Sequence, residues 1–313
     1  MKMRGSVRQR LLGCCLLAFG VLAACGDDDD GGPPPPPPDL ITFHSLNLQP
    51  EGLEYDESLG RFVVGSSTQG TIHTVDDDGN LALLVADPGL ASTLGLHIDR
   101  DRDVLFAAGS TTQGGAGLGV YDLANGEVIR VVDIAAGTSA GPAQLANDVV
   151  VADSGAAWVT ETLGSGVYAV DAAGTSSEFT TSPQLSLANG IELYNDEVLL
   201  IARIGGPLMR MRVGDPQSLE PVDTDQVVSG DGIVFTPQGD LAVVTIGGPA
   251  SVLLLRSDDD WQTATTIGTW DSATITDTEP TTAAVRGDDV YVIFARLFDE
   301  ANSRYDIERV VFE

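Results

Sequence analysis

Four residues with oxygen-bearing side chains stand at equivalent places in a repeat of this sequence. They are Glu51, Asn147, Asn189 and Asp231, and each opens a short apolar segment. Calcium takes carboxylate and amide oxygens as ligands, about six to eight of them when waters complete the set. Two converging carboxylates repel each other, and a divalent cation removes that cost. The four residues therefore predict a Ca²⁺ site. Another divalent metal is the alternative, with magnesium less favoured and zinc disfavoured where His and Cys are lacking.

The repeat that places these residues has six units, which start at positions 51, 94, 147, 189, 231 and 281. In each unit a turn precedes an alternating apolar segment, a polar turn and a second apolar segment. The third and fifth residues are apolar in every unit, so a period of two puts them on one face of a strand. Units of this length match the four-stranded blades of a propeller. With little helical periodicity, the chain is predicted to be all-β, with a six-bladed β-propeller over residues 40–313.

The two ends of the repeat region predict how the ring closes. The last unit supplies only three strands, near 282–286, 289–296 and 305–312, whereas residues 40–48 form a strand before the first unit. An open ring would expose an unpaired strand edge. We therefore expect the N-terminal strand to complete the last blade.

The first 24 residues are typical of a targeting segment. Four basic residues within the first ten precede the apolar run 11–24, which is too short for a comfortable membrane span. The run ends in Leu22-Ala-Ala-Cys25, which looks like a bacterial lipobox and implies cleavage before Cys25 and lipidation of that residue. An acyl chain would then anchor the protein to a membrane, in the cell envelope and outside the cytoplasm. An ordinary secretory peptide or a transmembrane anchor is the alternative.

Residues 25–39 contain four consecutive aspartates and six consecutive prolines. Such a segment cannot bury a core, and its prolines favour an extended chain. We interpret it as a tether between the lipidated Cys25 and the propeller. A polyproline ligand for another protein is the weaker interpretation.

Composition excludes several classes of function. The chain has 46 acidic and 16 basic residues, a formal net charge of −30, so no basic surface is left for a nucleic acid. Lys2 is the only lysine, which excludes enzymes that need a P-loop or Schiff-base lysine. Cys14, Cys15 and Cys25 are the only cysteines, so the propeller has no disulfide and no cysteine metal site. We expect a monomer.

Over residues 40–313 the sequence resembles the family of senescence marker protein (regucalcin), gluconolactonase and luciferin-regenerating enzyme. The resemblance lies in the strings around the four ring residues, PEGLEYD, ANDVVVADSGAAWV, ANGIELYN and GDGIVF. The family's propellers hold a divalent metal with Glu in the first blade, Asn in the third and fourth and Asp in the fifth, which this chain matches. Turn formation is the alternative explanation, because Asn-Gly and Asp-Gly are common turn sequences.

The resemblance implies a calcium-dependent lactonase, a carboxylic ester hydrolase that acts on a small-molecule lactone or ester. The metal would polarise the ester carbonyl. By resemblance Asp231 is the catalytic carboxylate that activates water, Glu51 is a ligand, and Asn147 and Asn189 bind metal or orient substrate.

Further candidates lie where the second strand of a unit returns to the channel mouth. Glu161, Arg203 and Arg296 are expected there, and the arginines can grip a substrate carboxylate. A salt bridge with Glu161 or with the ring carboxylates is the alternative role for the arginines. His97 is comparable to the channel histidines of the paraoxonase type, although packing between blades is the commoner role of such a residue.

One departure from the family weakens the assignment of a sugar lactone as substrate. Gluconolactonases carry an Arg two residues before the third-blade Asn, and this chain has Leu145 there. A more apolar lactone fits better. The second hypothesis is a non-catalytic propeller that binds a ligand or protein at its channel mouth and holds a structural metal ion, since fold alone does not decide between the two.

Overall fold

The computed structural model describes residues 36–86, 89–134, 145–247, 251–297, 299 and 301–313. Residues 37–313 form one compact unit. The leader, Cys25 and nearly all of the predicted tether lie outside the described residues. No helix among the described residues is long and apolar enough to cross a membrane.

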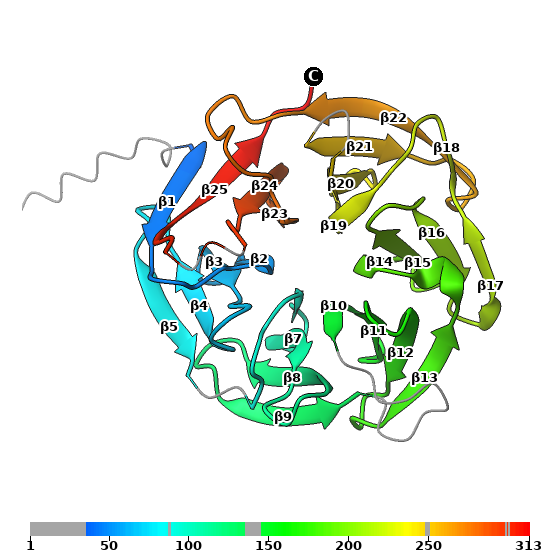
Figure 1. Ribbon diagram of the computed structural model, residues 1–313, viewed down its shortest axis with the longest axis horizontal. Coiled ribbons are helices and arrows are strands. Elements are labelled where there is room, and N and C mark those ends of the chain that lie inside the picture. Colours follow the sequence, from blue (N-terminus) through cyan, green and yellow to red (C-terminus); the bar gives the residue numbers. More distant parts are fainter. Residues whose placement is uncertain (1–35, 87–88, 135–144, 248–250, 298, 300) are drawn as a thin grey trace, which may run out of the picture. The chain divides into compact units, whose positions relative to one another are not determined.

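Six small antiparallel sheets stand in a ring, so the predicted six-bladed β-propeller is confirmed (Figure 1). From the centre outward, blade 1 is β2 (Leu53–Asp56), β3 (Arg61–Val64), β4 (Ile72–Val75) and β5 (Leu81–Val85). Blade 2 is β6 (Leu96–Asp99), β7 (Val104–Ser110), β8 (Ala116–Asp122) and β9 (Val128–Asp133). Blade 3 is β10 (Ala146–Val151), β11 (Ala157–Glu161), β12 (Gly166–Val170) and β13 (Ser176–Thr181).

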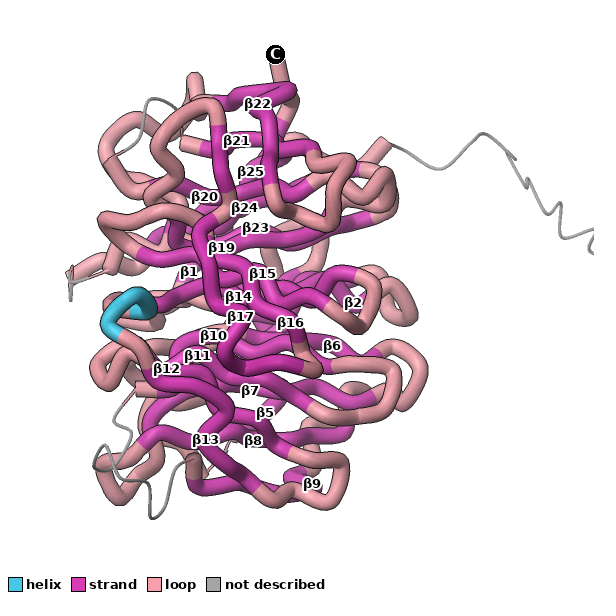
Figure 2. Tube along the Cα trace, turned by 90° about the vertical axis from the view of Figure 1, so that its right-hand side faces the viewer, coloured by secondary structure: helices cyan, strands magenta, loops and turns pink. Residues whose placement is uncertain are grey.

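Blade 4 is β14 (Ala188–Tyr194), β15 (Val198–Arg203), β16 (Met209–Arg212) and β17 (Asp215–Pro221). Blade 5 is β19 (Gly230–Phe235), β20 (Leu241–Thr245), β21 (Val252–Arg256) and β22 (Thr263–Trp270), and the short β18 (Asp223–Thr224) runs parallel to β22. Strand β18 has no counterpart in the repeat. The 3₁₀ turn η1 (Pro183–Leu185) leads into β14 at the face where the inner strands begin, here called the mouth, on the left in Figure 2.

Blade 6 is β23 (Thr282–Arg286), β24 (Asp289–Phe294), β25 (Arg304–Val310) and, outermost, β1 (Leu40–His44). The predicted closure is therefore confirmed. Strand β1 pairs with β25 from Leu40 opposite Glu308 to His44 opposite Arg304. The fully buried Asp306 accepts a 2.6 Å hydrogen bond from Thr42 across this pair. The first and last strands thus hold the ring together.

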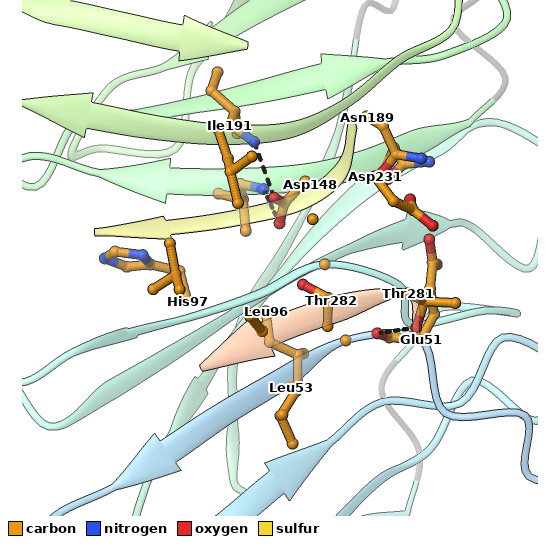
Figure 3. Close-up of a pocket in the computed structure, with 18 of the residues that line it drawn as sticks. Glu51, Leu53, Leu96, His97, Asp148, Asn189, Ile191, Asp231, Thr281 and Thr282 are labelled. Carbon is orange, nitrogen blue, oxygen red and sulfur yellow. Dashed lines mark hydrogen bonds between the residues drawn. The ribbon is translucent and has the colours of Figure 1, made fainter. Parts of the chain in front are cut away.

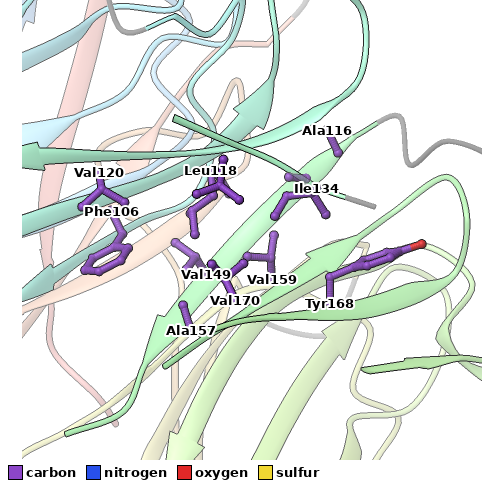
Figure 4. Packing of buried hydrophobic residues seen from close by; sticks show 13 residues of the cluster. Phe106, Ala116, Leu118, Val120, Ile134, Val149, Ala157, Val159, Tyr168 and Val170 are labelled. Carbon is purple, nitrogen blue, oxygen red and sulfur yellow. The ribbon is translucent and has the colours of Figure 1, made fainter. Parts of the chain in front are cut away.

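The hydrophobic core lies between neighbouring blades, as the alternation predicted. The third residue of every unit is buried, at positions 53, 96, 149, 191, 233 and 283. Between blades 2 and 3, Phe106, Leu118 and Val120 face Val149 and Val159 (Figure 4). Third residues thus pack against the preceding blade, which leaves the second and fourth residues for the channel.

Candidate functional site

The first residues of five units meet in one cavity on the ring axis. Glu51, Asn147, Asn189, Asp231 and Thr281 all line it (Figure 3). Its volume is about 30 Å³. That is room for one or two waters or a single ion, since one water needs about 10–15 Å³. The cavity is too small to enclose a lactone ring, so any substrate must sit above it at the mouth.

Bulges in three inner strands turn the ring residues toward this cavity. On β10 the pairing with β11 shifts between Ala146 and Val149, and the same shift occurs at Ala188/Ile191 on β14 and at Gly230/Ile233 on β19. Simple alternation would put the first residue of a unit on the same face as the third, against the neighbouring blade. An extra residue in the strand re-aims the side chains beside it. The first residues of blades 3, 4 and 5 consequently line the channel.

Close contact between inner strands narrows the channel at this level. The amide of Gly95 donates to the carbonyl of Asn147 at 2.7 Å, and the amide of Gly232 donates to the carbonyl of Thr281 at 2.9 Å. A Cβ on Gly190 would lie 2.5 Å from the carbonyl oxygen of Asp231. Only glycine permits this approach, which explains the Asn-Gly pair without reference to a turn.

Three carboxylates of the cavity were missed from the sequence: Glu54, Asp148 and Glu192. They are fourth or second residues of their units, and the alternation that buries the third and fifth residues was the signal that could have found them. Asp148 accepts hydrogen bonds from the amides of Val149, at 2.9 Å, and Ile191, at 3.0 Å. It therefore joins blade 3 to blade 4 between the two ends of the cavity (Figure 3).

Burial and mutual repulsion hold these carboxylates closer to the protonated form than usual. Burial, followed by the charges of Asp231 and Asp148, raises the pKa of Glu51 well above its ordinary value. Burial and Asp148 raise the pKa of Asp231 to about 7, against an opposing hydrogen bond from Asn189. Burial raises the pKa of Asp148 to about 7, while its two amide donors oppose the shift.

The other end of the cavity combines two carboxylates with a histidine. Burial raises the pKa of Glu54 to about 7, and burial together with the charge of Glu54 raises the pKa of Glu192 to about 8. His97 Nδ1 lies 4.0 Å from a carboxylate oxygen of Glu54. Burial and the nearby Arg100 lower the pKa of His97 to about 4, so its imidazole is neutral at pH 7. His97 thus lines the channel, but at the end away from Asp231 (Figure 3).

The other three predicted substrate residues do not line the cavity. Glu161 is buried and accepts hydrogen bonds from the amides of Leu145, at 3.1 Å, and Gly164. Arg296 pairs with Asp277 at 2.7 Å and lies 3.6 Å from Asp306, rather than near Glu161 or the ring. Their proposed contact with substrate stays a prediction.

Arg203 differs from Arg296 because no acidic side chain pairs with it in the described part of the chain. Its Nε donates to the carbonyl of Ser186 at 3.2 Å, at the mouth end of β15. Arg130 and Arg212 also have no ion pair with a described acidic side chain, so this feature alone does not single out Arg203. Its guanidinium has further donors for a ligand.

The donors at the ring suit a hard cation. The described residues contain no group of three or more His, Cys, Asp or Glu that could hold a metal. The predicted set is of another kind, with two carboxylates and two amides, and calcium accepts both. Among the described residues that line the cavity there is no Arg or Lys, so no side-chain cation offsets Glu51 and Asp231. A divalent cation would lower the cost of burying both charges.

Comparisons with known proteins identify the fold. No family model matches the chain, and no curated protein matches it. Three solved structures are similar over most of their length. The allergen Mala s 1 of Malassezia sympodialis is 20% identical, with a TM-score of 0.70 over 88% of this chain and 96% of its own. XC5397, a gluconolactonase of Xanthomonas campestris, is 15% identical, with a TM-score of 0.64 over 86% and 89%.

A luciferin-regenerating enzyme is 13% identical, with a TM-score of 0.61 over 87% of this chain and 95% of its own. Identities this low establish a common fold and leave activity open. The chain therefore shares its propeller fold with gluconolactonase, the luciferin-regenerating enzyme and Mala s 1.

Proposed function

We propose that this protein is a calcium-dependent lactonase or related ester hydrolase. The observation that carries the proposal is the convergence of Glu51, Asn147, Asn189 and Asp231 on one small cavity without an Arg or Lys among its described lining residues. These residues would hold Ca²⁺, and the fold shared with a gluconolactonase supports the reaction class. The bound cation would supply Lewis-acid polarisation of the ester carbonyl.

The chain's own residues have separate roles in this proposal. Asp231 is the carboxylate that would accept a proton from water; burial raises its pKa to about 7 in the metal-free protein, and a bound cation would lower that pKa. Asn189 donates a side-chain hydrogen bond to Asp231 and so fixes the position of that carboxylate. Glu51 acts as a ligand, and Asn147 binds the cation or orients the substrate.

We further propose that lipid on Cys25 anchors the protein in the cell envelope, outside the cytoplasm, as a monomer without a nucleic acid partner. The lipobox-like sequence and the acidic composition support this. Labelled fatty acid should be incorporated into the wild-type chain and not into Cys25→Ala. Equal labelling of both would exclude an anchor at this residue, and sedimentation analysis of residues 37–313 tests the monomer.

Thermal unfolding of residues 37–313, which contain the whole ring, tests the metal site. After purification with chelator, calcium at 100 times its dissociation constant should add about 2.7 kcal/mol to the free energy of unfolding. The gain should vanish in Asp231→Ala and Asn189→Ala. A native protein with no gain and no metal by elemental analysis would remove the site. A gain that survives in both variants would place the ion elsewhere. A positive result justifies a lactone screen.

A non-catalytic binding propeller is the second candidate, and the size of the cavity favours it. About 30 Å³ admits an ion or one or two waters but not a lactone ring. The allergen Mala s 1 has a similar fold, and fold alone does not establish hydrolase activity. Calcium binding without hydrolysis of any lactone or ester would support this candidate.

A further inference from the structure

The chain enters the propeller on the face opposite the mouth. In blade 6, β23 begins at the mouth, and β24, β25 and β1 follow it outward in antiparallel order. Strand β1 therefore begins on the opposite face, with Leu40 beside Glu308, and runs toward the mouth. We call this opposite face the back face. It is formed by the turns 57–60, 76–80, 100–103, 123–127, 152–156, 171–175, 195–197, 213–214, 236–240, 257–262 and 287–288.

Three hydrogen bonds hold the entering chain at the back face. The Arg309 amide donates to the carbonyl of Asp39 at 2.8 Å, and Arg309 Nε donates to the Asp39 carboxylate, also at 2.8 Å. The Tyr291 hydroxyl donates to the carbonyl of Pro38 at 2.9 Å. Tyr291 and Arg309 lie opposite each other near the back-face ends of β24 and β25. The segment that leads to Cys25 therefore starts from this face.

The length of that segment limits how the domain can stand on a membrane. Cys25 and Pro38 are 13 positions apart, so the chain between them spans at most about 45 Å. Its consecutive prolines favour a semi-rigid, extended chain, which resists a reversal next to the domain. To bring the mouth to the bilayer, the chain would have to return past β25, whose seven residues span about 23 Å, and then pass the mouth loops. The direct path favours the back face as the side nearer the membrane.

The two faces also differ in charge. Ten of the eleven back-face turns contain an acidic residue, and two of them carry runs of three aspartates, 76–78 and 258–260. Five connections on the mouth side contain no charged residue: 65–71, 111–115, 162–165, 182–187 and 204–208. Anionic headgroups repel the back face over about 10 Å at 0.1 M salt, a range much shorter than the tether. The repulsion therefore separates this face from the bilayer by a layer of solvent without turning the domain over.

We infer that the anchored protein holds its back face toward the membrane and its mouth toward the aqueous phase. Ligands then reach the ring residues from solution and not by lateral transfer from the bilayer. The inference rests on the proposed lipid anchor at Cys25, and it is independent of whether the ring catalyses hydrolysis.

Energy transfer from the protein to labelled lipid tests this orientation. The full-length lipidated protein would be added to preformed vesicles of phosphatidylethanolamine and phosphatidylglycerol that carry an acceptor dye on some headgroups. Cys25 is the only cysteine that remains after the expected cleavage, so a donor dye can be attached at one introduced cysteine. Ala124→Cys and Thr112→Cys are a matched pair, because both residues are exposed and they lie beyond the back-face and mouth ends of β8, respectively.

Transfer from Ala124→Cys should exceed transfer from Thr112→Cys by about twofold or more, because β8 separates the two sites by about 23 Å. Equal transfer from both sites, or stronger transfer from Thr112→Cys, would overturn the inference. A tether lengthened by about twelve Gly and Ser residues before Pro33 should reduce the difference, since such a chain is flexible. An undiminished difference would show that the tether does not set the orientation.

Salt tests the contribution of charge. Raising NaCl from about 20 to 500 mM shortens the screening length and should increase transfer from Ala124→Cys on the anionic vesicles, but not on phosphatidylcholine vesicles. No increase on the anionic vesicles would remove the repulsion from the inference.

The outcomes separate the orientation from the proposals on which it rests. If the wild type binds vesicles no better than Cys25→Ala, the anchor is removed and the orientation with it. If the wild type binds and Thr112→Cys gives the stronger transfer, the anchor stays and the orientation is wrong. Neither result changes the expected turnover of lactones, which is measured with residues 37–313.

Discussion

Blades 3, 4 and 5 differ from blades 1, 2 and 6 in one feature of their inner strands. Each of β10, β14 and β19 has a bulge next to its ring residue, whereas β2, β6 and β23 pair with their neighbours without interruption. The bulged strands present Asn147, Asn189 and Asp231 to the channel. The regular strands contribute Glu51 and Thr281 from positions before the strand begins. One repeat therefore brings its first residue to the channel in two ways, by a bulge in blades 3, 4 and 5 and from the segment before the strand in blades 1 and 6.

The largest contrast between the two halves should appear at Asp231 and Thr281, which occupy the same position in blades 5 and 6. Asp231→Ala should lower kcat/KM on a lactone by about a hundredfold or more, because it removes a ligand and the proposed base. It should also abolish stabilisation by calcium. Thr281→Val should change kcat/KM by less than about fivefold. Steady-state kinetics and calcium titrations check this, and equal losses in both variants would end the distinction between the two kinds of blade.

The bulge itself can be tested by adding a methyl group. Gly190→Ala places a Cβ against the carbonyl of Asp231 and should lower the free energy of unfolding by about 1–3 kcal/mol. A methyl group on Gly214 would meet nothing within 4 Å, and the φ of Gly214 lies outside the left-handed region, so Gly214→Ala should be close to neutral. Urea denaturation of both variants gives the comparison. A neutral Gly190→Ala would show that the inner strands of blades 4 and 5 have room for a side chain between them.

The pH dependence of stability tests whether the buried carboxylates of the channel bind protons more tightly in the folded protein than in the unfolded chain. Asp148 and Asp231 have pKa values of about 7 in the folded protein, above the ordinary values of the unfolded chain. The folded state therefore binds more protons between about pH 4 and 7, and stability in chelator should fall as pH rises through that window. His97, with its pKa lowered to about 4, acts in the opposite sense but is a single group. Melting curves from pH 5 to 8 check this, and calcium should remove most of the decline.

The smallest expected effect is at Glu279, two residues before Thr281. Its charge is the last of the factors that raise the pKa of Asp231. Glu279→Gln should lower that pKa by a few tenths of a unit, since Glu279 is exposed and solvent screens its charge. Carboxyl-carbon NMR titration in chelator resolves such a change. An upward shift would mean that Glu279 does not act on Asp231 through its negative charge.

The repeat was sufficient to predict the ring, the blade boundaries and the closure by β1, because burial of the third residue leaves a periodic signal. The side chains that meet at the ring also follow from their shared position. The bulges could not be predicted, because the sequences Asn-Gly and Asp-Gly occur both in tight turns and in bulged strands. The ion pair of Arg296 could not be predicted, because its partner Asp277 lies in an irregular connection that has no equivalent position in the repeat. Glu54 and Glu192 were overlooked although the alternation predicted their orientation.

Closure by β1 also has a consequence for the order of events during synthesis. Thr42 and its partner Asp306 are separated by 264 positions in the chain. At about 5–20 residues per second, a ribosome needs roughly 15–50 s to connect them. During that interval β1 has no partner, and blade 6 does not exist. The nascent chain can assemble single blades but not the ring, so it stays open until its last residues emerge, and a message truncated before β25 yields a product that cannot close.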